Sequence, residues 1–348
     1  MAARARVSAR GDVSAARAPA PCDGLGHRSR AVPRVPARQV RLMQRTCVVG
    51  AGAIGSLYAA HIARVADSCV LTRRPEHAAA LNVDGLRVSG RHEFTVPVTA
   101  ATDPADLPEP DLVIVATKAT GLEPAAASLA GRWPRANVMT VQNGLGAEEI
   151  VRRHGEWQLV SGVTFMSGTK HSDVHVEYIL DTATWLGPWA GTPFDRVQEI
   201  AALLESAGLK AEALPDLRPA QWSKLIFNAT VNAVAALTGL PHDSHFAAED
   251  GDADLGRLVH GLVDEGKRVA AAAGVDLRDD PWEMNVLATK RGSAHFPSML
   301  EDVQARRPTE VDLITGALVR EAERCGVGAQ LHSALYHLIK AREASYSA

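Results

Sequence analysis

A stripe of polar side chains runs along a predicted helix that is otherwise apolar. Lys224, Asn228 and Asn232 are spaced four residues apart within 222–232, so they share one face of that helix. A solvated outer face is the alternative, but asparagine is a mediocre helix former and suits such a face poorly. Burying unpaired amides and an ammonium is costly, so we expect these side chains to meet polar partners in a site.

Two more polar groups follow predicted strands. Lys118 comes after the apolar run 112–116, and Asn143 comes after the run 138–141. Ligands of open α/β sheets bind beyond the carboxyl ends of the strands, so both side chains are candidates for the same site. Asn143 precedes Gly144, and because Asn-Gly is also a common turn sequence, a purely structural turn is the alternative.

A glycine-rich segment stands between the first predicted strand and the first predicted helix. Residues 50–55 read Gly-Ala-Gly-Ala-Ile-Gly, which is the spacing GxGxxG. The first glycine permits a tight turn, the second lets the backbone approach a pyrophosphate, and the third lets helix and strand pack closely. A glycine-rich turn without a ligand is the alternative. The candidate cofactor-binding residues are Gly50, Gly52, Ala53, Ile54 and Gly55.

Two arginines end the second predicted strand, where an NAD-binding protein commonly has an acidic residue for the ribose 2′-hydroxyl. Arg73 and Arg74 stand there instead, and we expect no carboxylate nearby to repel a phosphate. A guanidinium can clamp a 2′-phosphate through two hydrogen bonds, so the sequence favours NADPH over NADH. A solvated loop is the alternative, more so for Arg73 than for Arg74.

The elements that position these residues alternate between strand and helix in the first half of the chain. Their apolar, uninterrupted strands predict a parallel sheet covered on both faces, which is the doubly wound, Rossmann-type arrangement. Segments 174–179 and 183–186 alternate in polarity and predict antiparallel strands at the far edge of that sheet. The other predicted elements are strands at 46–50, 69–72, 112–116 and 138–141 and helices at 54–65 and 123–129.

Strand signals stop near residue 214, and the rest of the chain is predicted to be all-helical. We therefore place a cofactor domain at 43–215 and a helical substrate and catalytic domain at 216–348. The predicted helices are 219–238, 255–273, 281–290, 298–306, 309–325 and 333–343.

Residues 1–42 differ from the remainder in composition. They are rich in Ala, Arg, Pro, Gly, Ser and Val without periodicity, which predicts a disordered tail. Met43 directly precedes the first strand, so a start codon assigned too far upstream is an equal alternative. A targeting peptide is disfavoured by frequent proline and by the missing amphipathic period.

Composition excludes several classes of function. The tail carries a charge of +7, which leaves −10 for the folded remainder and argues against binding to nucleic acid. The four cysteines lie far apart without a CxxC pair, so we expect neither a zinc site nor a disulfide framework, and a cytoplasmic setting fits best. No apolar stretch is long enough to predict a membrane span.

Taken together, these motifs resemble those of the ketopantoate reductase (2-dehydropantoate 2-reductase) family. The resemblance runs over roughly residues 46–340. One segment departs from it, because Phe165-Met166 and 170–175 are bulkier and more polar than is usual in the family, which affects substrate choice. The matching pieces, in family order, are 50–55, Arg74, Lys118, 142–146, 224–228 with Asn232, 297–302 and 308–312.

The resemblance implies a role for each matching residue. Lys224 is then the general acid, and Glu310 contacts a substrate hydroxyl and orients the site. Alternatives from the residues alone are a capping box for Ser298 and a favourable helix-dipole contact for Glu310. The substrate-binding residues are Asn143, Asn228, Asn232 and Ser298. The residues implied to hold NADPH are Gly50, Gly52, Ala53, Ile54, Gly55, Arg73, Arg74, Lys118, Asn143 and Glu310.

The implied activity is NADPH-dependent reduction of ketopantoate to pantoate, as in pantothenate biosynthesis, with no metal required. The physical logic agrees, because a positioned ammonium can stabilise the developing alkoxide and protonate it. Reduction of another small 2-oxo or 3-oxo acid and a non-catalytic NADP-binding sensor are the alternatives. A small 2-oxo acid is the expected partner, and a homodimer is compatible with the sequence.

Overall fold

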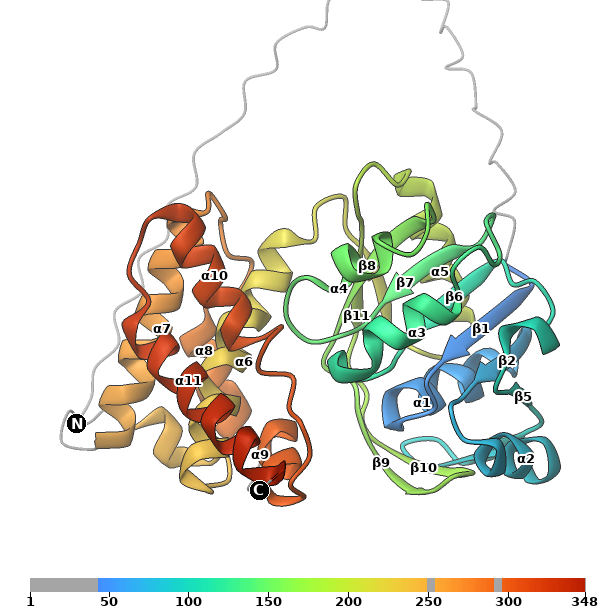
Figure 1. Ribbon diagram of the computed structural model, residues 1–348, viewed down its shortest axis with the longest axis horizontal. Helices are drawn as coiled ribbons and strands as arrows, with labels where there is room; N and C mark the ends of the chain where they lie inside the picture. The colour runs from blue at the N-terminus through green and yellow to red at the C-terminus, as the bar shows by residue number, and fades with distance from the viewer. Residues whose placement is uncertain (1–42, 249–253, 291–295, 348) are drawn as a thin grey trace, which may run out of the picture. The chain divides into compact units, whose positions relative to one another are not determined.

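An eight-stranded sheet forms the first half of the chain (Figure 1). The structure is a computed structural model that describes residues 43–248, 254–290 and 296–347, so the expectations for residues 1–42 lie outside the described part. The strand order is β12-β11-β8-β7-β6-β1-β2-β5. The strands are β1 (Arg45–Val49), β2 (Asp67–Leu71), β5 (Thr99–Ala101), β6 (Leu112–Val115), β7 (Asn137–Thr140), β8 (Gln158–Thr164), β11 (Thr184–Pro188) and β12 (Ala211–Ala213).

The direction of these strands confirms the doubly wound prediction. Neighbouring strands from β5 to β8 are parallel, whereas β11 runs antiparallel to β8 and pairs in parallel with β12. The predicted strand at 183–186 is therefore antiparallel and lies next to the edge strand of this sheet.

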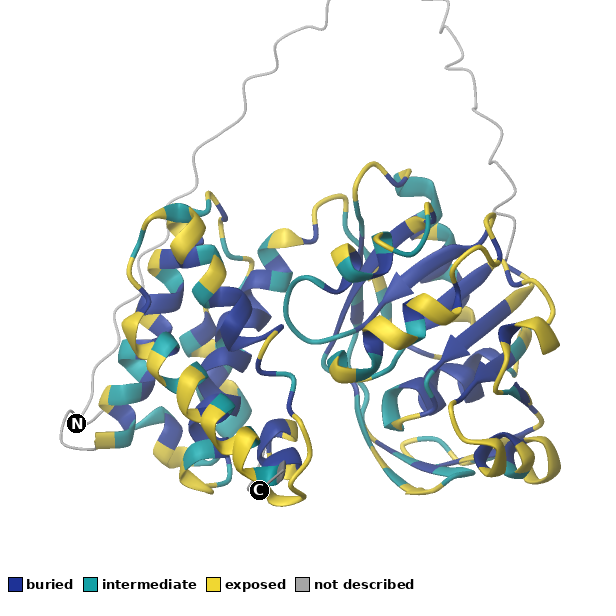
Figure 2. Cartoon of the chain, viewed as in Figure 1, coloured by how far each residue is buried: buried dark blue, intermediate teal, exposed yellow. Residues whose placement is uncertain are grey.

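Helices cover both faces of the main sheet, whose central strands β1, β6, β7 and β8 are almost entirely buried (Figure 2). Because side chains alternate along a strand, Val48 and Ile114 pack in one core while Cys47 and Val113 pack in another. The first core includes residues of α1 (Ala53–Ile62) and α5 (Phe194–Ser206). The second includes α3 (Leu122–Ser128) and α4 (Ala147–Arg152). Helix α2 (Pro75–Asp84) follows β2.

A second, four-stranded sheet corrects one prediction. Its order is β4-β3-β10-β9, formed by β3 (Leu86–Gly90), β4 (Phe94–Val96), β9 (Ser167–Ser172) and β10 (His175–Leu180). The prediction that 174–179 lies at the edge of the main sheet was wrong, because β10 pairs with β3 and β9. Alternating polarity indicates a half-buried strand, but it does not identify the strand that pairs with it.

The second half of the described chain contains no further sheet strand after β12, and its helices pack around α6 (Arg218–Thr238). Residues of α6 belong to three hydrophobic cores, and most of this helix is buried. The predicted helix 309–325 starts only at Thr315, and residues 311–314 form a turn instead. The remaining helices are α7 (Asp254–Ala272), α8 (Pro281–Thr289), α9 (Ser298–Gln304), α10 (Thr315–Cys325) and α11 (Gln330–Ala344).

Across the described residues, no helix combines the length and the hydrophobicity that a membrane span requires. Within the same residues, no group of three or more His, Cys, Asp or Glu side chains is placed to hold a metal ion.

Candidate active site

The glycine loop joins β1 to α1 at the carboxyl edge of the main sheet. Gly50 has a φ of +97° and its N–H donates to the Leu71 carbonyl oxygen, which ties the turn to β2. A methyl group on Gly55 would overlap the carbonyl oxygen of Gly50, so only glycine permits this packing. A methyl group on Gly52 would meet no atom within 4 Å.

The open space beside Gly52 gives a ligand access to the start of α1. The first N–H groups of a helix have no intrahelical partners, and α1 has no acidic residue in its first turn. An open face, free N–H groups and the positive end of the helix dipole together suit a pyrophosphate. Residues 50–55 therefore fit a dinucleotide cofactor, with Ala53 and Ile54 in the first turn of the helix.

The end of β2 carries an unpredicted carboxylate. Arg74 precedes α2, and its Nη2 lies 2.5 Å from Oδ1 of Asp173, a residue of the β9–β10 turn. The expectation that no carboxylate stands near the arginines was therefore wrong. No local pattern indicates this contact, because 99 residues separate the two partners. Arg73 is exposed.

Lys224 lies on α6 and is 8% exposed. Its ammonium donates to Oδ1 of Asn143 at 2.8 Å and to the carbonyl oxygen of Thr164. Burial lowers the pKa of Lys224 from 10.5 to about 8, and the nearby negative charge of Glu310 partly opposes that shift. The ammonium is thus an acid that can give up its proton close to neutral pH.

Asn143 connects Lys224 to Glu310. Its Nδ2 donates to Oε2 of Glu310 at 3.0 Å, while its Oδ1 accepts from the lysine. The other carboxylate oxygen of Glu310 accepts from the backbone N–H of Ala119 at 2.9 Å. Residues that follow β6 and β7 therefore meet α6 and the turn before α10 in one network.

Close backbone packing fixes the position of Asn143. Gly144 has a φ of +100°, and a methyl group there would overlap the carbonyl oxygen of Leu313. The next N–H, that of Leu145, donates to this same oxygen at 2.9 Å. Gln142 donates to the carbonyl oxygens of Val115 and Thr117 at 2.9 and 2.8 Å. Gln142 therefore ties the ends of β6 and β7 together, a role that its place beside Asn143 could have indicated.

Lys118 is engaged by a buried carboxylate that sequence reasoning missed. Its ammonium contacts Oδ1 of Asp302, which is 1% exposed. Arg307 donates to the same oxygen at 3.0 Å. The Lys118 side chain remains half exposed, so it keeps access to solvent beside the network.

Asn228 and Asn232 lie on α6 with Lys224, as the spacing predicts, and both are less than 9% exposed. Among the described residues, neither amide makes a side-chain hydrogen bond. Ser298 is exposed and is the first residue of α9, after Pro297 as the N-cap. The alternative capping box is therefore wrong, because the α9 N-cap makes no side-chain hydrogen bond.

An aromatic group stands beside Lys224. The ammonium lies 4.9 Å from the centre of the Phe165 ring, and that ring packs against Trp185 and Phe227 with centres 5.9 and 6.4 Å apart. The bulky side chain of Phe165, which is unusual for the family, therefore lies beside the candidate proton donor. Its contact with Lys224 was not predicted from the sequence.

The doubly wound fold with its glycine loop is typical of a class, the oxidoreductases that use a nicotinamide dinucleotide. The chain belongs to the ketopantoate reductase family. Residues 46–191 match the family model described as "Ketopantoate reductase PanE/ApbA", and residues 216–343 match "Ketopantoate reductase PanE/ApbA C terminal".

Curated relatives and solved structures agree with this family. The 2-dehydropantoate 2-reductase of Archaeoglobus fulgidus is 29% identical over 301 residues, which cover 86% of this chain and 98% of the relative. The crystal structure of the PanE/ApbA family ketopantoate reductase from Ralstonia eutropha JMP134 matches this chain with a TM-score of 0.79 at 25% identity. The match covers 88% of this chain and all of that one. D-Mandelate dehydrogenase, solved with NADH and anilino(oxo)acetate, shares the fold with a TM-score of 0.78 at 22% identity, covering 88% of this chain and all of that one.

Proposed function

We propose that this protein reduces 2-dehydropantoate (ketopantoate) to pantoate with NADPH, as in pantothenate biosynthesis. The observation that carries the proposal is the buried Lys224, hydrogen-bonded to Asn143 and with a pKa lowered to about 8. Residues 43–215 would bind the cofactor and residues 216–348 would supply the acid. A cytoplasmic setting and a homodimer are part of the same proposal.

The chain's own residues account for the proton and the charge. When bound, the cofactor supplies a hydride to the 2-oxo carbon. Lys224 stabilises the negative charge that develops on the carbonyl oxygen and donates the proton that makes the hydroxyl group. Asn143 holds the ammonium in place and takes part in binding both ligands.

Substrate recognition is assigned to groups with free hydrogen-bonding capacity. Asn228 and Asn232 offer nearly buried amides on the same face as Lys224. Ser298 adds an exposed hydroxyl at the start of α9. Glu310 would accept a hydrogen bond from the substrate hydroxyl, since carboxylate oxygens can accept more than one. Burying this carboxylate without that partner would cost desolvation free energy, so the site would favour a hydroxylated substrate.

Cofactor binding is assigned to the carboxyl edge of the sheet. Residues 50–55 would hold the pyrophosphate, and Arg74, assisted by Arg73, would hold the 2′-phosphate. Lys118, Asn143 and Glu310 lie at the ends of neighbouring strands or in contact with them, where the nicotinamide half is expected.

Steady-state NADPH oxidation tests the substrate. We expect kcat/KM for ketopantoate to exceed that for 2-oxoisovalerate, which lacks the hydroxyl group, by about tenfold or more, the scale of one lost hydrogen bond. Comparable values would mean that Glu310 does not recognise a substrate hydroxyl. No oxidation with any 2-oxo acid, despite tight NADPH binding, would favour the non-catalytic sensor.

A second candidate is a reductase for a 2-oxo acid with a larger apolar group. Phe165 favours it, because this ring and its neighbours Trp185 and Phe227 place an apolar surface beside the lysine. A panel that includes phenylpyruvate separates the two candidates. Under the second candidate, phenylpyruvate would have the highest kcat/KM of the panel, and Phe165→Ala would lower that value more than the one for ketopantoate.

A further inference from the structure

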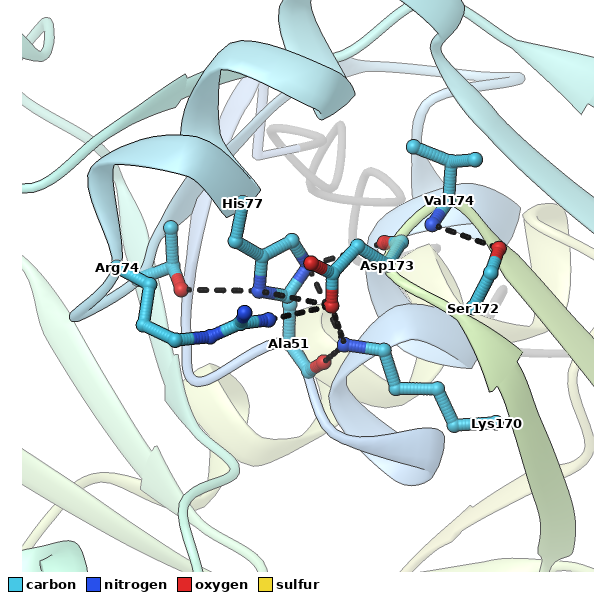
Figure 3. A network of polar contacts seen from close by, with 8 residues as sticks. Ala51, Arg74, His77, Lys170, Ser172, Asp173 and Val174 are labelled. Atoms are coloured by element: carbon cyan, nitrogen blue, oxygen red, sulfur yellow. Dashed lines mark hydrogen bonds and ion pairs between the residues drawn. The ribbon is translucent and has the colours of Figure 1, made fainter.

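The turn between β9 and β10 places a carboxylate at the end of β2 (Figure 3). Oδ1 of Asp173 lies 2.5 Å from Nη2 of Arg74 and accepts a hydrogen bond from Nζ of Lys170 at 3.2 Å. Nδ1 of His77 is 3.8 Å from the same oxygen. One carboxylate oxygen therefore occupies a position surrounded by a guanidinium, an ammonium and an imidazole.

Two contacts hold this turn against the nucleotide site. Lys170 donates to the carbonyl oxygen of Ala51, within the glycine loop, at 2.9 Å. His77 Nε2 is 3.0 Å from the backbone carbonyl oxygen of Asp173. The turn is thus tied both to the loop after β1 and to the first turn of α2, the two segments that border the adenosine half of a bound dinucleotide.

Asp173 is an anion at neutral pH. Burial acts to raise its pKa, but hydrogen bonds from Lys170 and Arg74 lower it below its usual value. The side chains of Asp173 and Arg74 are 33% and 52% exposed, so a ligand in solution can reach the pair.

We propose that Asp173 is a specificity-determining residue that opposes NADPH by occupying the position at Arg74 that a 2′-phosphate requires. The phosphate and the carboxylate are both anions, and they compete for the same guanidinium. NADH has no phosphate there and does not need to displace Asp173. This inference rests on the proposed function for the glycine loop. It predicts that the ratio of the NADH Kd to the NADPH Kd is smaller than it would be if Arg74 had no carboxylate beside it.

Calorimetric titration of the whole protein with NADPH and with NADH measures the Kd of each cofactor without any turnover. Asp173→Asn removes the charge and keeps a residue that suits a turn. We expect the ratio of the NADH Kd to the NADPH Kd to rise about tenfold, the scale of one charge-assisted hydrogen bond. The matched control is Glu177→Gln on β10, whose carboxylate contacts His171 instead, and its ratio should stay at the wild-type value.

A double-mutant cycle isolates the contact with Arg74. In an Arg74→Ala background, Asp173→Asn should leave the ratio unchanged, because no guanidinium remains to compete for. Adenosine 2′,5′-bisphosphate and 5′-AMP, used as fragments, should repeat the result for the adenosine half alone. An unchanged ratio in Asp173→Asn, or an equal rise with and without Arg74, would overturn the proposal.

The same titrations separate this inference from the proposed cofactor preference. Wild-type protein that binds NADH more tightly than NADPH would contradict NADPH as the preferred cofactor. The inference would nevertheless stand if Asp173→Asn moved the ratio about tenfold toward NADPH. A wild-type preference for NADPH that Asp173→Asn does not change would support the cofactor assignment and contradict the inference.

Discussion

Turnover is expected to fall as the pH rises through about 8, because the proposed proton donor is Lys224. Burial lowers the pKa of this group to about 8, and its charge interaction with Glu310 acts in the opposite direction. A general acid acts only when protonated, so about nine-tenths of the molecules are competent at pH 7 and about one-tenth at pH 9. The rate of the chemical step should therefore be level below about pH 7 and drop about tenfold per pH unit well above 8.

Substitution of the lysine gives the size of the effect. Lys224→Ala should lower kcat by about 10²–10⁴-fold, the range for a lost general acid, and should remove the alkaline decline from what remains. NADPH binding should survive, since the glycine loop does not contact this side chain. Lys267→Ala is the matched control, because it removes a lysine from the surface of α7 where it pairs with Asp280.

Single-turnover absorbance of NADPH is the appropriate assay, because slow product release can hide the chemical step. A rate that stays level from about pH 6 to pH 10 would contradict the assignment. A Lys224→Ala variant that keeps more than half of the wild-type rate would do the same.

Three further predictions concern binding and stability. Arg74→Ala should weaken NADPH binding by about 1.5–3 kcal/mol and leave NADH nearly unaffected in titrations, and equal losses would refute its role. Gly144→Ala should lower both Tm and kcat, because a methyl group would collide with the Leu313 carbonyl oxygen; unchanged values would show that the loop can shift freely. Glu265→Ala should destabilise the fold by about 3–5 kcal/mol in urea unfolding, because Glu265 makes buried contacts with His332; a loss below about 1 kcal/mol would contradict this.

The same buried carboxylate, Glu265, makes the free energy of unfolding depend on pH in the acid range. Burial acts to raise the pKa of Glu265, but hydrogen bonds from His332 bring it below the usual value. A carboxylate with a lowered pKa stabilises the fold at neutral pH, and that contribution is lost as the pH falls through the folded-state pKa. The Glu265→Ala variant should therefore lose less stability than the wild type between neutral and acid pH.

Local spacing was sufficient to predict much of the fold and part of the candidate site. Residues four apart on a helix must share a face, so Lys224, Asn228 and Asn232 could be grouped without knowing what they contact. Residues after parallel strands must lie at one edge of the sheet, which brought Lys118 and Asn143 together. These inferences need only the geometry of a single element or of neighbouring strands.

Contacts between distant segments were beyond such reasoning. Asp173 reaches Arg74 only because β10 pairs with β3, and alternation in polarity does not specify that pairing. Asp302 lies 184 residues from Lys118, and nothing in its local sequence indicates a buried acid. Thr309 is likewise held by a distant group, since its backbone N–H and its hydroxyl both donate to the Glu343 carboxylate on α11.

The orientation of the Asn143 side-chain amide limits which residues can replace it. Its oxygen faces an ammonium and its nitrogen faces a carboxylate, so a cation and an anion together select one of the two orientations of a symmetric-looking amide. An aspartate at position 143 would place a negative charge beside the Glu310 carboxylate. A lysine there would place a positive charge beside the Lys224 ammonium. Only a neutral group with a donor at one end and an acceptor at the other satisfies both neighbours, so a change of charge at Lys224 or Glu310 would also alter which side chain suits position 143.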